Sequence, residues 1–212
     1  MPQIAEGLLQ SDDKKIRCKW HGNDSDYLKY HDTEWGYPVS DDRHLFEKIS
    51  LEGFQAGLSW LTILRKRDKF RKAFDNFDYI KIAKYNEKKI LHLLDDQGII
   101  RHRGKIEATI NNAQKARDLI DEFGSLAAYF WRFEPEVSAR PKKMTAKILF
   151  SLAQTKESQA MSKDLKKRGW KFVGPTTCYA FMQSMGIVND HIEGCFCRPI
   201  CDRERKKFKK PF

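Results

Sequence analysis

The apolar positions along the chain recur at helical spacing over most of its length. A helix is expected to begin at Ser40, a typical N-cap residue, and a second one near Ser59. The same spacing predicts a long helix over about residues 103–122 and shorter ones over about residues 157–168 and 175–185. Strand-like alternation of apolar and polar residues is scarce. The sequence therefore predicts a nearly all-α protein.

The domain organisation is expected to be simple. A chain of 212 residues is long enough for one domain with a substantial core, and it contains no Pro/Gly/Ser-rich linker. We expect residues 1–15 to be a flexible leader, residues 16–201 to form a single unit, and residues 202–212 to be a poorly ordered basic tail. Residues 141–156 show no readable pattern.

The net charge of +11 points to a polyanionic partner, with nucleic acid favoured over an anionic membrane. A basic but unspecialised surface is the alternative. The chain has no apolar stretch that approaches the length of roughly 20 residues needed to span a bilayer. Its start lacks the basic segment followed by a long apolar run that marks a secretory signal. Its five cysteines are an odd number, and four of them lie in residues 178–201. We therefore expect a reduced, cytoplasmic protein with a metal site and no disulfide framework.

Metal-ligand residues occur near both ends of the chain. The first segment runs from Cys18 to Gly36 and the second from Val188 to Cys197. Each offers a histidine and a cysteine, and together they make a Cys2His2 set of the kind that holds a tetrahedral zinc. Taken singly, each histidine is more often a buried, satisfied ring, and each cysteine a small core residue. A shared ion would hold the two ends together.

A glycine-bounded turn lies between the last two expected helices. Gly169 and Gly174 bracket it, Lys171 lies within it, and three basic residues precede it. Gly174 permits close approach of a ligand, and the helix that follows exposes unpaired N–H groups that suit a phosphate. This pattern is typical of a helix-hairpin-helix that grips a DNA backbone. An ordinary αα-hairpin with Gly169 as a C-cap is equally compatible with the spacing. A second basic turn, residues 98–105, is better explained as a plain connection.

Together these segments resemble the family of 3-methyladenine DNA glycosylase I, the constitutive alkylation-repair glycosylases of bacteria. The resemblance covers about residues 18–200 and leaves out the leader and the tail. It is carried by the following motifs: Tyr30-His31-Asp32-x-Glu34-Trp35-Gly36, Leu51-Glu52-Gly53-Phe54-Gln55-Ala56-Gly57-Leu58-Ser59-Trp60, Gly98-Ile99-Ile100-Arg101-His102-Arg103-Gly104-Lys105, Lys171-Phe172-Val173-Gly174 and Val188-Asn189-Asp190-His191.

The resemblance implies a helix-hairpin-helix DNA glycosylase fold with one zinc ion that joins the N- and C-terminal segments. The family's zinc ligands correspond to Cys18, His31, His191 and Cys195, with Cys197 as a rival for the last place and Cys201 as a weaker one. Four protein ligands leave no open position for water, so this zinc is expected to be structural.

The resemblance also implies a pocket for a flipped base. It places Tyr27, Tyr30 and Trp60 around the base and makes Glu52 the pocket carboxylate, which accepts from the exocyclic amine and offsets the positive charge. A guanine would present a carbonyl oxygen there, which a carboxylate disfavours. From sequence alone the aromatic residues could equally be plain core. Leu58 is expected to fill the gap that the flipped base leaves, although a buried leucine is the alternative.

The expected reaction is hydrolysis of the N-glycosidic bond of 3-methyladenine in double-stranded DNA by a monomeric enzyme. Thr176 stands where bifunctional relatives carry a lysine nucleophile, which argues against a lyase step. The water activator stays unassigned, since Asn189 falls at the place of the usual aspartate and Asp190 is its neighbour. Two alternative functions are compatible with the sequence: a zinc-stabilised DNA-binding module without catalysis, and a glycosylase with another lesion range. Glu52 with Trp60 favours the enzyme, because a mere binder needs neither.

Overall fold

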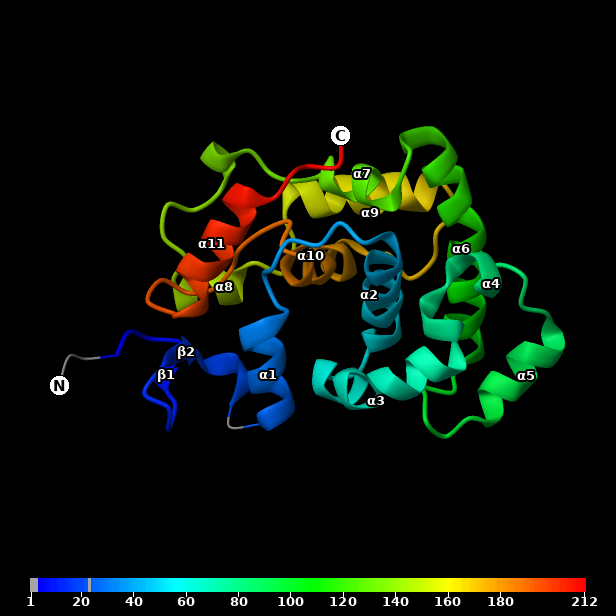
Figure 1. The fold of residues 1–212 in the computed structure, drawn as a ribbon, viewed down its shortest axis with the longest axis horizontal. Coiled ribbons are helices and arrows are strands. Elements are labelled where there is room, and N and C mark those ends of the chain that lie inside the picture. The colour runs from blue at the N-terminus through cyan, green and yellow to red at the C-terminus, as the bar shows by residue number, and fades with distance from the viewer. Residues whose placement is uncertain (1–3, 23) are drawn as a thin grey trace.

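Helices make up most of the structure, a computed structural model that describes residues 4–22 and 24–212 (Figure 1). The described α-helices are α1 (Ser25–Thr33), α2 (Asp42–Gln55), α3 (Trp60–Ala73), α4 (Tyr79–Ile82), α5 (Glu87–Asp95), α6 (Arg103–Phe123), α7 (Leu126–Trp131), α8 (Ala146–Ser151), α9 (Lys156–Lys167), α10 (Pro175–Ser184) and α11 (Cys197–Lys207). The described residues also form short 3-10 helices, namely η1 (Lys19–His21), η2 (Asp75–Phe77) and η3 (Val137–Ala139). One two-stranded antiparallel sheet pairs β1 (Leu8–Gln10) with β2 (Ile16–Cys18).

The helices begin where short polar side chains cap them. Ser59 accepts from the Thr62 N–H and starts α3, as the sequence predicts. At α2 the cap is Asp41 and not Ser40, because the Asp41 carboxylate accepts from the His44 N–H at 2.7 Å. A carboxylate at this position also complements the positive end of the helix dipole. The five helices predicted from spacing are all present, and the starts and ends that were predicted lie within one or two residues of the observed ones.

Helix α2 lies at the centre of the molecule. It packs against α3, α6, α7 and α10, and all ten of its residues from Leu45 to Phe54 are buried. Its apolar side chains, such as Phe46 and Ile49, belong to the main core. Because the helix is covered on every side, its polar residues Lys48 and Glu52 are buried as well. This burial places two charges next to the pocket described below.

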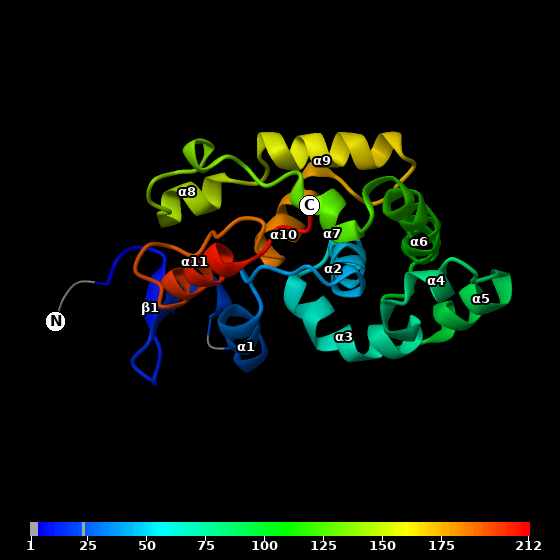
Figure 2. The same ribbon diagram turned by 45° about the horizontal axis from the view of Figure 1, so that its top comes forward.

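Segments from the two ends of the chain lie side by side. Figures 1 and 2 show β1, β2 and α1 beside α8 and α11 at one end of the molecule, with α3 to α6 at the other end. Helices α2 and α10 lie between these two ends, and α9 packs on α10. The end where the N-terminal segment meets α11 contains the metal-ligand residues, whereas the pocket lies between it and α2.

The structure differs from the sequence-based expectation at both ends. Within the expected leader, Leu8 is buried and β1 pairs with β2, so this part has defined structure; residues 1–3 lie outside the described residues. In the expected tail, α11 continues to Lys207, and the Phe208 ring stacks on Trp131 at 4.3 Å between centroids. Charge alone suggested disorder there, yet Arg205 is held by an ion pair with Glu134. No helix of residues 4–22 and 24–212 is both long and apolar enough to cross a membrane.

Candidate active site and metal site

A pocket of about 350 Å³ opens between α1, α2, the start of α3, α8 and α10. It brings together all four residues expected around the base, namely Tyr27, Tyr30, Glu52 and Trp60. The remaining lining residues are Trp20, Trp35, Gln55, Leu149, Phe150, Leu152, Ala180 and Gln183. Apolar pockets of this size with a few polar groups are the usual sites of small ligands. A purine ring therefore fits the size and character of this pocket.

The aromatic residues are fixed by the local structure. Tyr27 and Tyr30 lie one turn apart on α1, and the Tyr27 hydroxyl accepts from the Leu61 N–H at 3.1 Å. Trp60 is the first residue of α3, and its ring lies 5.5 Å from that of Tyr30 between centroids. The Trp60 Nε1–H is buried and has no hydrogen-bond partner among the described residues. An unpaired buried donor costs stability unless a ligand satisfies it.

Glu52 does not stand alone in the pocket wall. Its carboxylate is 3.0 Å from the ammonium of Lys48, one turn earlier on α2. Lys48 also donates to the Tyr30 hydroxyl at 2.8 Å and lies 3.3 Å from the centre of the Trp60 ring. Burial raises the pKa of Glu52 and lowers the pKa of Lys48 to about 8, although each partner opposes the shift of the other. Because each group favours the charged form of the other at 3.0 Å, the two side chains form a buried ion pair.

Sequence reasoning missed Lys48 and one wall of the pocket. Lys48 stands four residues before Glu52 on a predicted helix, a spacing that brings the two side chains together, so a signal was present. The wall formed by α8 comes from residues 141–156, where the sequence showed no pattern because the helix has only six residues. Trp20, Trp35 and Gln183 belong to segments whose meeting depends on the tertiary fold.

The turn between α9 and α10 has a defined conformation. Arg168 is the C-cap of α9, and Gly169 follows it with φ +84°, while the Trp170 N–H donates to the Leu165 carbonyl at 2.9 Å. The backbone of Lys171 is held from both sides by the Asn112 side chain of α6. Gly174 is the N-cap of α10, and no side chain caps this helix.

Leu58 lies in the short loop between α2 and α3 and is 40% exposed, so it is not a core leucine. Lys105 fixes the start of this loop by donating to the carbonyls of Phe54 and Ala56 at 2.8 and 2.6 Å. This contact also gives the basic turn over residues 98–105 a structural task, which agrees with its interpretation as a connection.

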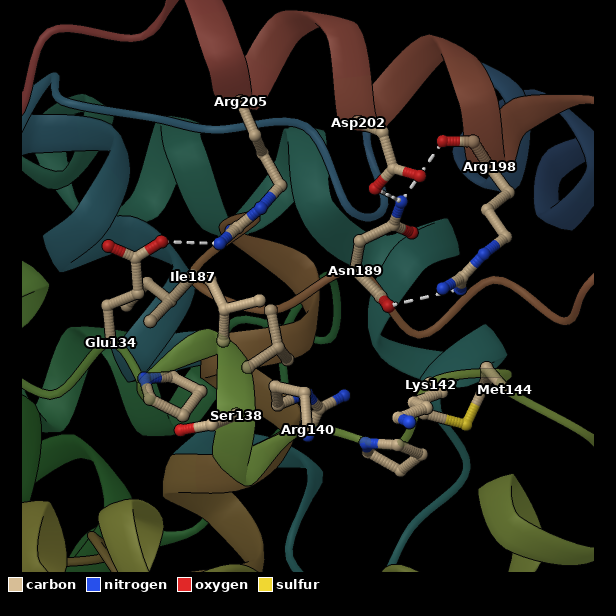
Figure 3. Close-up of a pocket in the computed structure, with 14 residues that line it drawn as sticks. Glu134, Ser138, Arg140, Lys142, Met144, Ile187, Asn189, Arg198, Asp202 and Arg205 are labelled. Carbon is tan, nitrogen blue, oxygen red and sulfur yellow. Dashed lines mark hydrogen bonds and ion pairs between the residues drawn. The ribbon is translucent and has the colours of Figure 1, made fainter.

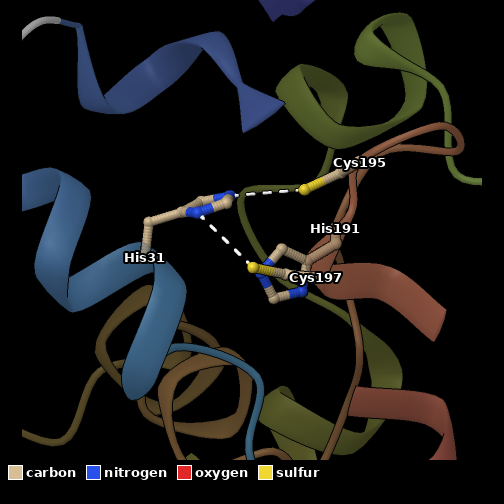
Figure 4. A group of neighbouring side chains, drawn as sticks. All are labelled: His31, His191, Cys195 and Cys197. Atoms are coloured by element: carbon tan, nitrogen blue, oxygen red, sulfur yellow. Dashed lines mark hydrogen bonds between the residues drawn. The ribbon is translucent and has the colours of Figure 1, made fainter. Parts of the chain in front are cut away.

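Four buried side chains near the termini form a group that suits a metal ion. Ligand atoms of His31, His191, Cys195 and Cys197 all lie within 4.8 Å of one another (Figure 4). Cys18 packs in the same buried cluster as Cys195 and Cys197, and its sulfur accepts from the Ile192 N–H at 3.3 Å. Three of the four predicted ligands, His31, His191 and Cys195, thus belong to this group, and Cys197 takes the fourth place, with Cys18 packed beside it.

Neighbouring side chains orient both histidines. Asp32 lies 2.8 Å from Nδ1 of His31, and the Asn189 amide oxygen lies 2.9 Å from Nδ1 of His191. Such contacts fix the tautomer and leave Nε2 for a metal. The Nε2 atom of His191 is buried and has no hydrogen-bond partner among the described residues, and burial lowers the pKa of His191 to about 3. A neutral, unsatisfied imidazole beside thiols is a donor set that fits zinc.

A larger cavity of about 550 Å³ lies beneath α11, and two of the arginines that line it are already paired (Figure 3). Arg205 pairs with Glu134, and Arg140 pairs with Asp190. Asp190 is fully buried and also accepts from the Tyr179 hydroxyl at 2.5 Å and from Gln183 at 2.9 Å. These three donors hold the Asp190 carboxylate in place within the fold.

Comparisons with known proteins agree with this geometry. A family profile described as methyladenine glycosylase matches residues 20–198. DNA-3-methyladenine glycosylase 1 of Escherichia coli strain K12 is 47% identical over 184 residues, which make up 86% of this chain and 97% of that protein. DNA-3-methyladenine glycosylase of Haemophilus influenzae strain Rd is 48% identical, again over 86% of this chain and 97% of that protein.

Solved structures give the same result. A crystal structure of 3-methyladenine DNA glycosylase I matches with a TM-score of 0.79 at 48% identity, covering 86% of this chain and 100% of that one. The Staphylococcus aureus enzyme, solved to explain its recognition of 3-methyladenine, matches with a TM-score of 0.79 at 34% identity, covering 86% and 96%. The resemblance found in the sequence is thereby confirmed, and the chain belongs to the methyladenine glycosylase family.

Proposed function

We propose that this protein is a monofunctional DNA glycosylase that flips 3-methyladenine out of alkylated DNA and hydrolyses its N-glycosidic bond. The observation that carries the proposal is a single pocket in which the buried carboxylate of Glu52 lies among the rings of Tyr27, Tyr30 and Trp60. Its family relatives are named for the same base, which supports the choice of substrate.

The pocket chemistry suits a cationic purine. Methylation at N3 leaves a positive charge on the base, and aromatic faces stabilise such a cation by about 1–2 kcal/mol per desolvated contact. Glu52 accepts from the exocyclic amine and offsets the charge. When water attacks C1′ of the sugar, the electrons of the N-glycosidic bond pass to the base, which leaves as a neutral molecule. A leaving group that is already positive needs little acid catalysis.

Double-stranded DNA is the proposed partner, bound by a monomer in the cytoplasm. We assign the α9–α10 unit as the helix-hairpin-helix, with Gly169 and Lys171 shaping the turn and Gly174 at the uncapped start of α10. The N–H groups at such a helix start suit a backbone phosphate. Leu58, exposed beside the pocket, is the proposed wedge that occupies the place of the flipped base.

Side chains near the two termini would hold one structural zinc, namely Cys18, His31, His191 and Cys195. Cys197 competes with Cys18, because it belongs to the compact group. However, the sulfur of Cys197 lies 3.8 Å from Nδ1 of His31, the nitrogen that Asp32 already occupies. The Cys195 sulfur lies 3.5 Å from Nε2 of the same ring, close to the roughly 3.3–3.8 Å that separates ligand atoms around a tetrahedral zinc. Bound zinc would fix the segments that carry Trp20 and Tyr30.

One assay separates the proposed enzyme from a DNA-binding module without catalysis. The protein is incubated with DNA methylated at ring nitrogens, and the released bases are identified by chromatography. Release of free 3-methyladenine is expected, with no borohydride-trapped protein–DNA complex, because Thr176 replaces a lysine nucleophile. Tight DNA binding without base release would leave only the binding module. Release of other methylated purines at equal rates would widen the lesion range.

A further inference from the structure

Lys48 is a buried cation in contact with the pocket, and the proposed reaction does not use it. It contacts three lining residues, namely Tyr30, Glu52 and Trp60, and it does not itself line the pocket. Its side chain is 4% exposed. Buried lysines are rare unless they are paired, and this one is paired with the carboxylate that the substrate needs.

The free pocket already contains a balanced charge. The Lys48 ammonium neutralises Glu52 at 3.0 Å and lies over the Trp60 ring at 3.3 Å and the Tyr30 ring at 4.7 Å. These are the contacts that a cationic base would also make. A second cation next to the same carboxylate and the same two rings would leave one uncompensated positive charge in a desolvated site, which is costly.

We propose that Lys48 is a specificity-determining proton switch: it keeps Glu52 ionised in the free protein and releases its own proton to solvent when the cationic base binds. The inference rests on the proposed function of the pocket. In this step one Nζ–H bond of Lys48 breaks, its electron pair stays on the nitrogen, and the proton passes to water. The Tyr30 hydroxyl, 2.8 Å away, then donates to the amine where it previously accepted.

The surroundings of Lys48 favour this release. Around it lie His44 one turn earlier on α2, Tyr30 on α1, and Arg67 of α3, which is paired at 2.5 Å with Glu34 beyond α1. Burial outweighs the attraction of Glu52 and brings the pKa of Lys48 down to about 8, so one proton is available close to neutral pH. Below this pKa the proton must be removed before the cation binds. Affinity for a cation should therefore rise with pH and level off above the pKa.

Two small ligands test the proposal without any turnover. The first is 3-methyladenine, the neutral product. The second is 3,9-dimethyladeninium, in which the N9 methyl group stands for the sugar and keeps the ring cationic. The protonation state of Lys48 is followed by the ¹³Cε chemical shift in lysine-labelled protein, and its resonance is assigned as the one lost in Lys48→Met or, if that variant fails to fold, in Lys48→Arg.

At about pH 7 we expect Lys48 to be an ammonium in the free protein and with 3-methyladenine, and a neutral amine with 3,9-dimethyladeninium. Cation affinity should rise about tenfold per pH unit below the pKa of Lys48. Lys48→Arg cannot lose its proton, so it should lose at least about tenfold in cation affinity at pH 8 and show no pH dependence. If Lys48→Arg binds neutral 3-methyladenine with a Kd within about threefold of that of the parent protein, the pocket of the variant is intact.

An ammonium that persists with the bound cation, or an unchanged cation affinity in Lys48→Arg, overturns the switch. If the parent protein still releases 3-methyladenine from methylated DNA in that case, only the role of Lys48 fails. If neither ligand binds and no base is released, the proposed function fails together with it.

Discussion

Glu52 and Lys48 illustrate how burial alters the effect of a single residue. A carboxylate alone in this pocket would tend to be protonated, because burial raises its pKa. Lys48 opposes that shift, so the negative charge that the base requires depends on a neighbour. Glu52 was identifiable from the sequence through the motif around it, whereas no motif singled out Lys48.

The substitution Glu52→Gln should lower single-turnover release of 3-methyladenine by about 10- to 150-fold, and Glu52→Ala by more. The reason is the loss of a charge-assisted hydrogen bond worth roughly 1.5–3 kcal/mol, of which the glutamine amide oxygen replaces a part. Parent-like release in both variants would remove Glu52 from the site.

Both substitutions leave the Lys48 ammonium without its partner, which lowers the free energy of unfolding by up to about 3–5 kcal/mol. The loss is smaller where Lys48 gives up its proton and becomes a neutral amine. A matched control is Lys48→Met combined with Glu52→Gln. It should regain thermal stability but not activity. Recovery of activity together with stability would mean that Glu52 matters for folding and not for the base.

At the scale of elements, the long helices were predictable and the short ones were not. The turns and caps of α3, α6, α9 and α10 rest on local signals such as Ser59 and Pro175, which do not depend on the rest of the fold. Helix α8 has six residues, too few to show a periodic face, although it forms one wall of the pocket. The β1–β2 pair was missed because three-residue strands show almost no alternation.

The α9–α10 turn offers a test of DNA binding. A Cβ at Gly174 would meet only Thr177 Oγ1, at 3.9 Å, so Gly174→Ala should fold normally. A methyl group at this surface would still keep a phosphate from the N–H groups at the start of α10. We expect affinity for duplex DNA to fall roughly tenfold at all sequences, with the melting temperature unchanged.

Gly104→Ala is the matched control, since it adds a methyl group to the other glycine-bounded basic turn, 3.3 Å from the His102 ring. Its DNA affinity should stay near that of the parent protein when measured by fluorescence anisotropy at several salt concentrations. Equal losses in the two variants would show that the α9–α10 turn is not a special contact.

For the molecule as a whole, the metal group is the feature that joins distant parts of the chain. The sequence supplied three members of the group that the structure forms, His31, His191 and Cys195, but the choice between Cys18 and Cys197 depends on distances that only the fold determines. Gly36 shows how tightly this region is packed, because a Cβ there would lie 2.8 Å from the His191 ring.

We expect purified protein to contain one zinc per chain, and Cys18→Ser to lose it while Cys197→Ser retains it. Cys178→Ser is the control, since Cys178 is buried outside the metal group and its thiol donates to the Val173 carbonyl. Metal content by atomic absorption and melting curves with and without a chelator provide the measurement. Protein with free zinc at about a thousand times its Kd should have a free energy of unfolding about 4 kcal/mol higher than zinc-free protein. The helical core should stay folded after zinc is removed. Loss of zinc in Cys197→Ser alone would reverse the ligand assignment.

The pairing of the two ends also has a consequence for protein synthesis. The contact between Cys18 and Ile192 joins residues 174 positions apart, so it forms only after nearly the whole chain has left the ribosome. Until then the segment that carries Trp20, Tyr27 and Tyr30 lacks the partner that fixes it. A nascent or prematurely terminated chain would therefore carry the basic surface that attracts DNA without a finished pocket. Such a product could occupy the chromosome, but it could not cut bases from it.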